Sequence, residues 1–290
     1  MKKYFIVAVI LIAVGVLFSL PTGSGKLQIY FFDVGQGDAT LIKTPSGGTI
    51  LIDGGPDRKI LRQLGSALPF GKRTIDLVIL SHPHADHVTG LVGVLERYKV
   101  KRVLATGVVH TTAEYLQWLA QIKEQNIPWL TAVAGKRISF ADGVSLEILW
   151  PPDSLAEKKV DDLNESSGVV KLNYGSTSVL FTGDITASNE QQILINQTQV
   201  ASQILKVPHQ GSKTSSSIEF IKAVAPAWAV IFVGKNNRYG HPHAEVVARY
   251  QKQGIKTLRT DELGTIRFIS DGKNWQYKKP WSLINLYNLL

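Results

Sequence analysis

One short stretch, Ser81-His-Pro-His-Ala-Asp-His87, constrains the fold and the chemistry of this chain more than any other. It follows Ile75-Asp-Leu-Val-Ile-Leu80, an apolar and β-branched run that predicts a buried strand. Val88-Thr-Gly-Leu91 then leads toward a helix. Polar side chains that leave the carboxyl end of a strand lie where α/β folds place their sites. We therefore predict an α/β fold with a functional site at this turn.

Imidazole and carboxylate groups dominate this stretch. Three of the chain's seven histidines lie within it. Its candidate metal ligands are His82, His84, Asp86 and His87. Such donors suit zinc, manganese or iron, and the absence of cysteine excludes thiolate ligands and disulfide bonds. A polar loop that is rich in histidine by chance is the competing interpretation.

The composition describes an ordinary globular protein with a basic surface. Of 290 residues, 44% are hydrophobic and 19% are charged, which allows a large core and gives no sign of disorder. The net charge of +9 favours a polyanionic partner, either nucleic acid or an anionic membrane, with solubility charge as the alternative. No organic cofactor is expected, because Gly35-x-Gly37 joins two expected strands rather than a strand and a helix.

Residues 1–25 are predicted to be a secretory signal or a membrane anchor. Two lysines precede an uncharged run from Tyr4 to Leu20, and Pro21 then breaks the pattern. The run is at the short end of the ~20 residues that span a bilayer, and no clean cleavage site follows it. We favour an uncleaved anchor in the cell membrane with the domain outside the cytoplasm, because lysines stay inside. Secretion is the alternative.

The remaining chain is expected to form one domain over residues 26–280. Expected hairpins alternate with expected helices, and two of these helices span residues 57–72 and 111–126. This alternation predicts sheets with helices on their outer faces. No repeat, low-complexity tract or linker interrupts this region. Residues 281–290 form an apolar C-terminal tail.

Two further carboxylates follow apolar strands. Asp53 ends the run Thr49–Ile52 and precedes two glycines, and Asp184 follows the run Ser178–Phe181. A carboxylate in the first place can accept a hydrogen bond from a metal-ligating histidine, which is the role we predict for Asp53. Capping of a turn is the alternative. The place of Asp184 suits a carboxylate that bridges metal ions.

Two later loops, residues 208–217 and 234–241, carry hydroxyl, amide and amino groups. Hydroxyl donors at a helix N-terminus favour phosphate, although capping of the next helix explains the first loop equally well. Donors beside an aromatic ring suit a nucleic-acid backbone. His241 is a further candidate ligand. The candidate substrate-binding residues are Ser212, Lys213, Asn237 and Tyr239.

Together these residues resemble the metallo-β-lactamase superfamily. The resemblance is carried by the histidine motif, Asp53, Thr182-Gly-Asp184 and His241. Four other stretches resemble the metallohydrolase domain of the ComEC competence proteins, which act in DNA uptake: Asp33–Asp38, Leu205–Ser212, Asn236–Pro242 and Thr260–Ile266. The similarity covers about residues 26–278. It implies a four-layer αβ/βα sandwich with the metal site at one edge of two packed sheets.

The resemblance also implies a site for one or two divalent ions, Zn²⁺ or Mn²⁺. The implied ligands are His82 and His84 for one ion, Asp86, His87 and His241 for the other, and Asp184 as a bridge. Asp86 and Asp184 are the candidate catalytic residues, with Asp86 as a proton acceptor.

Two positions depart from the family pattern. Asn164 stands where the superfamily usually has a third histidine for the first ion. Gln210 stands where competence proteins often have the second histidine of His-His-Gly-Ser. An amide oxygen is a weaker ligand than imidazole, so three outcomes are open: Asn164 completes the first site, His209 completes it, or the first ion is held loosely.

The expected activity is hydrolysis of phosphodiester bonds in DNA outside the cytoplasm. A hydrolase of small esters or lactones on the same fold is one alternative, because a fold does not fix a substrate. A surface DNA-binding module without catalysis is another. The chain has one long apolar segment, so it cannot form the multi-helix channel of the competence proteins.

Overall fold

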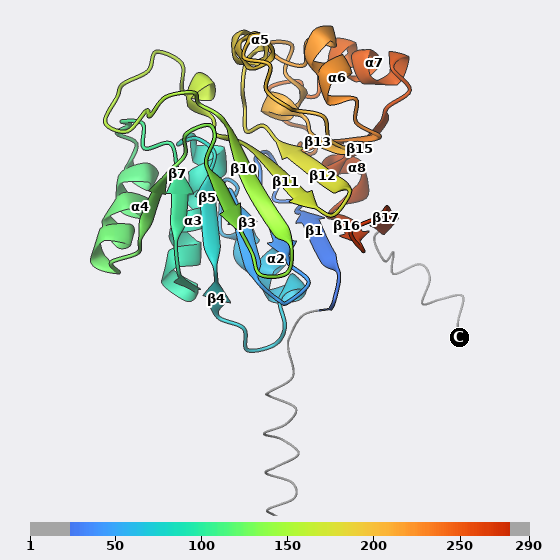
Figure 1. The fold of residues 1–290 in the computed structure, drawn as a ribbon. Coiled ribbons are helices and arrows are strands. Elements are labelled where there is room, and N and C mark those ends of the chain that lie inside the picture. The colour runs from blue at the N-terminus through green and yellow to red at the C-terminus, as the bar shows by residue number, and fades with distance from the viewer. Residues whose placement is uncertain (1–23, 279–290) are drawn as a thin grey trace, which may run out of the picture.

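The strands that carry the motifs are buried on both faces. The computed structural model describes residues 24–278. In it, β5 (Leu77–Leu80) and β12 (Thr177–Phe181) are buried along their whole length. Strands of this kind are apolar throughout because layers cover both faces of their sheet. They lie in two different sheets that pack against each other (Figure 1).

The first sheet has the strand order β17-β16-β1-β2-β3-β5-β7-β8. Its strands are β1 (Leu27–Phe31), β2 (Thr40–Lys43), β3 (Thr49–Ile52), β5, β7 (Val103–Ala105), β8 (Trp129–Thr131), β16 (Ile266–Ser270) and β17 (Trp275–Lys278). The pairs from β3 to β8 are parallel and the others are antiparallel. A separate parallel pair joins β4 (Thr74–Ile75) and β6 (Lys99–Val100).

The second sheet has the order β15-β14-β13-β12-β11-β10-β9. Its strands are β9 (Arg137–Ser139), β10 (Val144–Trp150), β11 (Val169–Tyr174), β12, β13 (Ile204–Lys206), β14 (Trp228–Ile231) and β15 (Lys256–Arg259). The pairs from β12 to β15 are parallel. Both sheets therefore contain a parallel half, where connections must cross over the sheet.

Helices cover the outer face of each sheet. The helices over the first sheet are α2 (Lys59–Ala67), α3 (Ala85–Arg97) and α4 (Ala113–Glu124), which share one apolar cluster with it. Those over the second sheet are α5 (Ala187–Ile195), α6 (Ile218–Val224) and α7 (Ala244–Lys252). Short helices are α8 (Thr260–Leu263), η1 (Leu163–Ser166) and η2 (Pro208–Gly211). The predicted α/β fold, a four-layer αβ/βα sandwich, is confirmed (Figure 1).

One predicted helix is shorter than expected. The sequence predicts a helix over residues 57–72, and α2 ends at Ala67. Leu68 is extended, with ψ 151°, because the ring of Pro69 disfavours a helical conformation in the residue before it. The chain then turns out into solvent before it enters β4.

Between Ser24 and Lys278, none of the helices combines the length and apolar character that crossing a bilayer requires. The predicted N-terminal segment, apart from its last two residues, and the predicted tail 281–290 lie outside the described residues.

Candidate metal centre

The carboxyl ends of the parallel strands place the motif residues together. β5 ends at Leu80 and leads into Ser81, and α3 begins at Ala85 with His84 as its N-cap. His82 and His87 are buried, whereas His84 and Asp86 are partly exposed. His82 Nε2 lies 2.9 Å from His84 Nδ1. The four predicted ligands of this stretch are therefore neighbours at one edge of the first sheet.

Asp53 fixes the orientation of His87 from behind. It follows β3 and has a left-handed backbone, with φ 57°. Ser81 N–H donates to Asp53 Oδ1 at 2.8 Å, and the Ser81 hydroxyl donates to Asp53 Oδ2 at 2.8 Å. The same Oδ2 lies 2.9 Å from His87 Nδ1. This contact is the one expected of a carboxylate that orients a ligand, and it leaves His87 Nε2 facing the site.

Asp184 approaches His87 from the second sheet. It follows β12, is buried, and its N–H donates to Ser167 Oγ at 3.0 Å. Its Oδ2 lies 3.3 Å from His87 Nε2. The ligand atoms of His82, His87 and Asp184 all lie within 4.8 Å of one another. The two packed sheets thus each contribute donors to one small volume.

A buried lysine holds the other side of Asp184, and sequence reasoning did not assign it to the site. Lys206 ends β13, and its ammonium group donates to Asp184 Oδ1 at 3.0 Å and to Gly183 O at 2.7 Å. It also pairs with Asp38. The available signal was a lysine at the end of an apolar strand, because lysine is almost never fully buried unless it is paired.

These close contacts shift the pKa values of the buried groups. Burial lowers the pKa of His82 well below its usual range, and the neighbouring His87 adds to this effect. Burial alone would lower the pKa of His87, but the carboxylates around it, Asp184 first, raise it well above its usual value. Burial alone would raise the pKa of Asp184, but the Lys206 ammonium holds that pKa well below its usual range.

The donor set fits a divalent cation. Among the described residues, His87 Nε2 and one oxygen of Asp38 are buried without a hydrogen-bond partner. Four carboxylates surround the cluster, those of Asp38, Asp53, Asp86 and Asp184, against the single ammonium group of Lys206. Excess buried negative charge beside imidazole nitrogens is a suitable environment for Zn²⁺ or Mn²⁺.

A cavity of about 310 Å³ opens onto this cluster. Its lining residues are His84, Ala85, Asp86, Asp184, His209, Gln210, Tyr239 and His241. The rings of His209 and His241 lie 5.7 Å apart, and Tyr239 stacks on His241 at 5.8 Å. Burial and the nearby His209 lower the pKa of His241 to about 4, so its imidazole is neutral at pH 7. His241 and His209 therefore both line the cavity, together with His84 and Asp86 of the motif.

Gln210 stands where competence proteins often have a second histidine, and its side chain has defined contacts in the structure. It is buried, and its side-chain amide donates to Asp86 Oδ2 at 2.7 Å. The side chain of Gln36 donates to Gln210 Oε1, and Gly234 N–H donates to Gln36 Oε1 at 2.9 Å. This row of amides links both halves of the molecule to Asp86. The sequence signal for Gln36, its place in a glycine turn, was too weak to assign it.

Gly37 lets the loop of residues 33–38 pack closely against the start of α3, which carries the motif. Its φ is 150°, and a Cβ atom there would lie 2.3 Å from the backbone oxygen of Asp86. Asp38 N–H donates to the same oxygen at 3.2 Å. The loop of residues 33–38 and the start of α3 are therefore one close-packed unit.

Several predicted site residues do not line the cavity, among them Asn237, Ser212 and Asn164. The Asn237 amide is engaged within its own loop: it donates to Gly234 O and His241 O and accepts from the N–H groups of Tyr239 and His241. These contacts shape the loop, and the role of Asn237 in binding substrate stays a prediction. The Ser212 hydroxyl is buried against Thr214. Asn164 is not among the lining residues, and its buried Oδ1 has no partner within residues 24–278.

Lys213 is exposed beside the cavity and does not line it either. Its backbone N–H donates to His243 Nδ1 at 3.3 Å. Of the four predicted substrate-binding residues, the structure brings Tyr239 to the cavity lining itself.

Comparison with known proteins identifies the family. A model of the metallo-beta-lactamase superfamily matches residues 32–235. The ComE operon protein 3 of Bacillus subtilis (strain 168) is 32% identical over 272 residues, which cover 87% of this chain and 34% of that protein. The competence protein ComA of Neisseria gonorrhoeae is 31% identical over 255 residues, which cover 86% of this chain and 33% of that protein. The chain thus spans about a third of the length of these relatives.

A solved structure agrees on the fold. CmlA, a diiron β-hydroxylase from Streptomyces venezuelae, superposes with a TM-score of 0.53 at 16% identity, over 84% of this chain and 54% of that one. At this identity the likeness concerns the fold and carries no reaction. The predicted resemblance to the competence proteins is confirmed by the two relatives. The chain belongs to the metallo-β-lactamase superfamily of hydrolases.

Proposed function

We propose that this chain is a metal-dependent phosphodiesterase that cleaves DNA outside the cytoplasm. The observation that carries the proposal is the buried histidine and aspartate cluster, which opens onto a cavity lined by further imidazoles and a tyrosine. The competence protein among the relatives supports DNA as the substrate, as does the net charge of +9.

The site residues divide between binding metal and binding substrate. His82, His84, Asp86, His87, Asp184 and His241 would hold one or two divalent ions, Zn²⁺ or Mn²⁺. Such ions supply positive charge to the phosphate and lower the pKa of a water molecule. Asp86 lines the cavity and is held by the amide of Gln210, which donates to its Oδ2, so Asp86 is placed to accept a proton.

The cavity size suits one phosphodiester group with its adjoining sugars. Its volume of about 310 Å³ lies at the small end of ligand sites. Tyr239 is half exposed at the rim, where its ring offers a surface on which a base can stack. Three exposed basic residues lie on the two loops that line the cavity, residues 208–217 and 234–241, and would contact the flanking phosphates: Lys213, Lys235 and Arg238.

Localisation at the outer face of the cell membrane is part of the proposal. It rests on the apolar run from Tyr4 to Leu20 behind Lys2 and Lys3. Separation of cells into medium and membrane fractions tests it. A mature N-terminus near residue 23 in the medium would contradict the anchor and support secretion.

Hydrolysis is tested with the purified full chain, single- and double-stranded DNA, and bis-p-nitrophenyl phosphate, with Mn²⁺, Zn²⁺ or a chelator. We expect cleavage that needs metal and is lost in His84→Ala. The matched control is His110→Ala, because His110 lines a separate cavity away from the cluster. Substrates that stay intact with either metal would overturn the proposal.

Two other functions have different signatures in the same experiment. A small-molecule hydrolase would cleave esters or lactones and leave DNA intact. A DNA-binding module would retain DNA in a salt-sensitive way without cleavage, and elemental analysis would find almost no metal per chain. Asn164 keeps the metal count informative, because an amide oxygen is a weaker ligand than the histidine that the superfamily usually has at that position.

A further inference from the structure

A turn remote from the metal centre presents a fully exposed aromatic ring. Phe70 has an exposed fraction of 108%, and the next most exposed large hydrophobic residue among those described is Ile195, at 60%. Lys72 N–H donates to Pro69 O at 3.0 Å, which closes a β-turn around Phe70 and Gly71. Gly71 has φ 78°, the left-handed value that the third position of a type II turn requires. The turn therefore holds the ring out into solvent.

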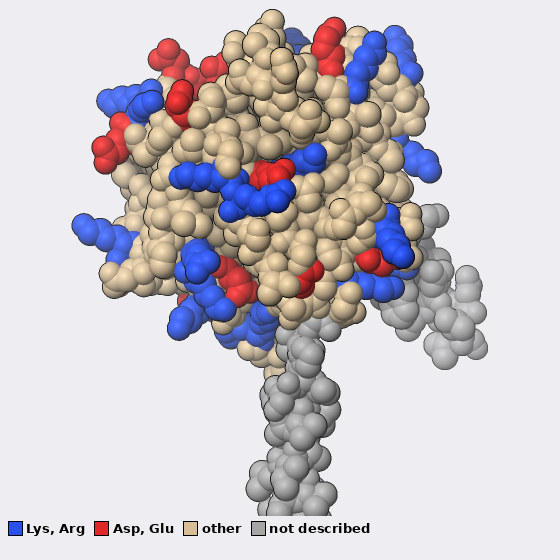
Figure 2. All heavy atoms as spheres, in the orientation of Figure 1, with Lys and Arg blue, Asp and Glu red and all other residues tan. Residues whose placement is uncertain are grey.

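Basic side chains surround this turn. Arg73 follows it directly, and Lys99 N–H donates to Arg73 O at 2.7 Å, because β4 and β6 are paired there. Lys101 lies two residues beyond Lys99, and its ammonium group pairs with Asp76 at 2.7 Å. Two acidic residues lie at this end: Asp76, which pairs with Lys101, and Asp142, which accepts hydrogen bonds from Ser46 in the neighbouring hairpin loop. Figure 2 shows basic side chains gathered at this lower end of the molecule.

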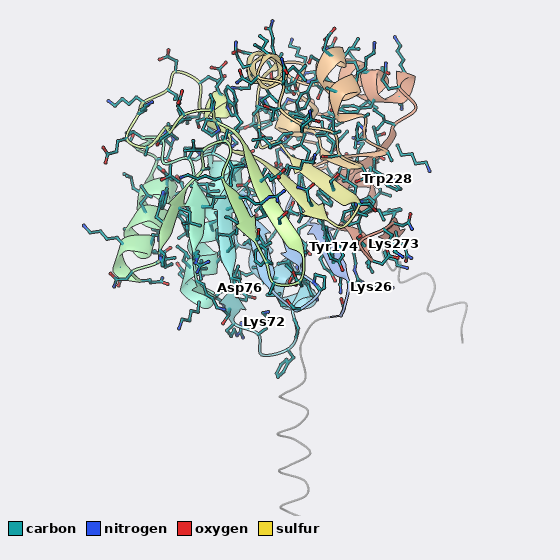
Figure 3. The ribbon with its side chains drawn as sticks, in the orientation of Figure 1. Lys26, Lys72, Asp76, Tyr174, Trp228 and Lys273 are labelled. Carbon is teal, nitrogen blue, oxygen red and sulfur yellow. The ribbon has the colours of Figure 1, made fainter. Side chains whose placement is uncertain are left out.

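The described chain begins beside the same turn. Gly25 N–H donates to Pro45 O at 3.2 Å, and the Lys72 ammonium donates to Gly47 O at 2.5 Å. The first described residues and the Phe70 turn are thus attached to one hairpin loop, residues 44–48. Lys26, Lys72 and Asp76 all lie at the lower end of the molecule in Figure 3. The sequence that precedes this point contains the uncharged run from Tyr4 to Leu20.

We propose that this end of the domain, formed by residues 69–73 with Lys99 and Lys101, docks on the surface of an anionic lipid bilayer. The Phe70 ring enters the boundary between headgroups and acyl chains, and the basic side chains bind lipid phosphates. A single ring within a basic surface suits lipid better than protein, because protein interfaces bury a broader apolar patch. A chain held by its N-terminal run would bring this end to the bilayer first.

The docked orientation separates the membrane from the metal centre. β5 begins beside the paired strands β4 and β6 and ends at the motif. The six steps from Ile75 to Ser81 span about 20 Å at ~3.3 Å per residue. The metal centre then lies at the end of β5 that is far from the lipid, where a polymer can approach it. The inference needs no particular substrate, and its failure leaves the proposed hydrolysis untouched.

The absence of cysteine permits a direct test. The full chain with Pro69→Cys is labelled with a nitrobenzoxadiazole maleimide, once with Phe70 intact and once with Phe70→Ser. The matched control carries the label at Ile195→Cys, on α5 at the opposite end of the molecule (Figure 1). Each protein is mixed with vesicles of phosphatidylglycerol and phosphatidylcholine, with vesicles of phosphatidylcholine alone, and with doxyl-lipid quenchers.

We expect a blue shift and doxyl quenching of the label at position 69 in anionic vesicles. Both signals should fall with Phe70→Ser and be absent at position 195. The double variant Arg73→Gln, Lys99→Gln should reduce the ratio of lipid-bound to lipid-free label about fivefold for each charge removed. Three results would overturn the proposal: no flotation with vesicles, equal signals at both label positions, or a shift that appears without lipid, which would indicate contact between copies of the chain.

Discussion

Asp53 and Asp184 occupy matching places in the two sheets, yet their surroundings differ. Each follows a buried strand and each contacts one nitrogen of His87. Asp53 receives its hydrogen bonds from Ser81, a neutral partner within the first half of the chain. Asp184 is held by the Lys206 ammonium and faces the ligand atoms of His82 and His87.

This difference separates two tasks that a carboxylate can perform at a metal centre. Asp53 lies behind His87 and can affect a metal ion only through that ring. Asp184 keeps an oxygen in the space where the donors converge, and the positive charge of Lys206 keeps its carboxylate ionised. We therefore predict that substitutions of Asp184 or of its partner Lys206 have larger effects than a substitution of Asp53.

The largest effect is expected from Lys206→Met. The change removes the ammonium group that pairs with the buried Asp38 and Asp184, which should cost about 3–5 kcal/mol in the free energy of unfolding. Urea denaturation of the metal-free protein measures it. The control is Lys222→Met, since Lys222 is exposed on α6. Equal unfolding midpoints for the two variants would contradict the role given to Lys206.

The next effect is expected from Asp184→Asn, which removes a charged donor from the converging set. Metal affinity should fall more than about 100-fold, beyond the range for residues that act through a ligand. Competition with a chelator measures affinity, and elemental analysis measures metal per chain. Asp161→Asn, in an exposed loop, is the control. Unchanged metal content in Asp184→Asn would remove Asp184 from the set of ligands.

A smaller effect is expected from Asp53→Asn. The amide can still accept from Ser81, but it no longer favours the orientation and tautomer of His87 that the carboxylate sets. Metal affinity should fall about 10–100-fold. The same chelator competition applies, with the exposed Asp57→Asn as the control. A loss as large as that of Asp184→Asn would show that the two carboxylates do not divide their tasks as proposed.

The smallest effect is expected from Gln210→Ala, which breaks the row of amides behind Asp86. Loss of the bond to Asp86 and of the contact with Gln36 should lower the free energy of unfolding by about 1–2 kcal/mol. Thermal unfolding measures this change beside Gln192→Ala, which alters an exposed glutamine on α5. Identical melting temperatures would mean that the row of amides contributes nothing to the fold.

Local patterns in the sequence were sufficient for the sheets and for the motif. β5 and β12 are short apolar runs followed by polar turns, so their position and the place of His82 and Asp184 just after strands could be predicted. α2 ends before the predicted boundary, because the ring of Pro69 acts on Leu68 although the apolar pattern continues beyond it.

Contacts between distant segments could not be read from local patterns. Lys206 meets Asp38 and Asp184, and Gln36 meets Gln210, only after the two sheets have packed. The same limit applies to Asn237, whose residue type suits phosphate but whose amide is used up within its own loop. Side-chain chemistry predicts what a residue can bind, whereas the folded chain decides what it does bind.

The contact at Gly37 matters to anyone who would redesign this enzyme for another substrate. Any side chain at position 37 would collide with the backbone of Asp86, so residues 33–38 make a poor place for a mutant library. Residues 235–239 are mostly exposed, and Tyr239 already reaches the cavity. Residues 33–38 are thus fixed by close packing, whereas residues 235–239 can be varied. A search for new specificity should therefore start with residues 235–239.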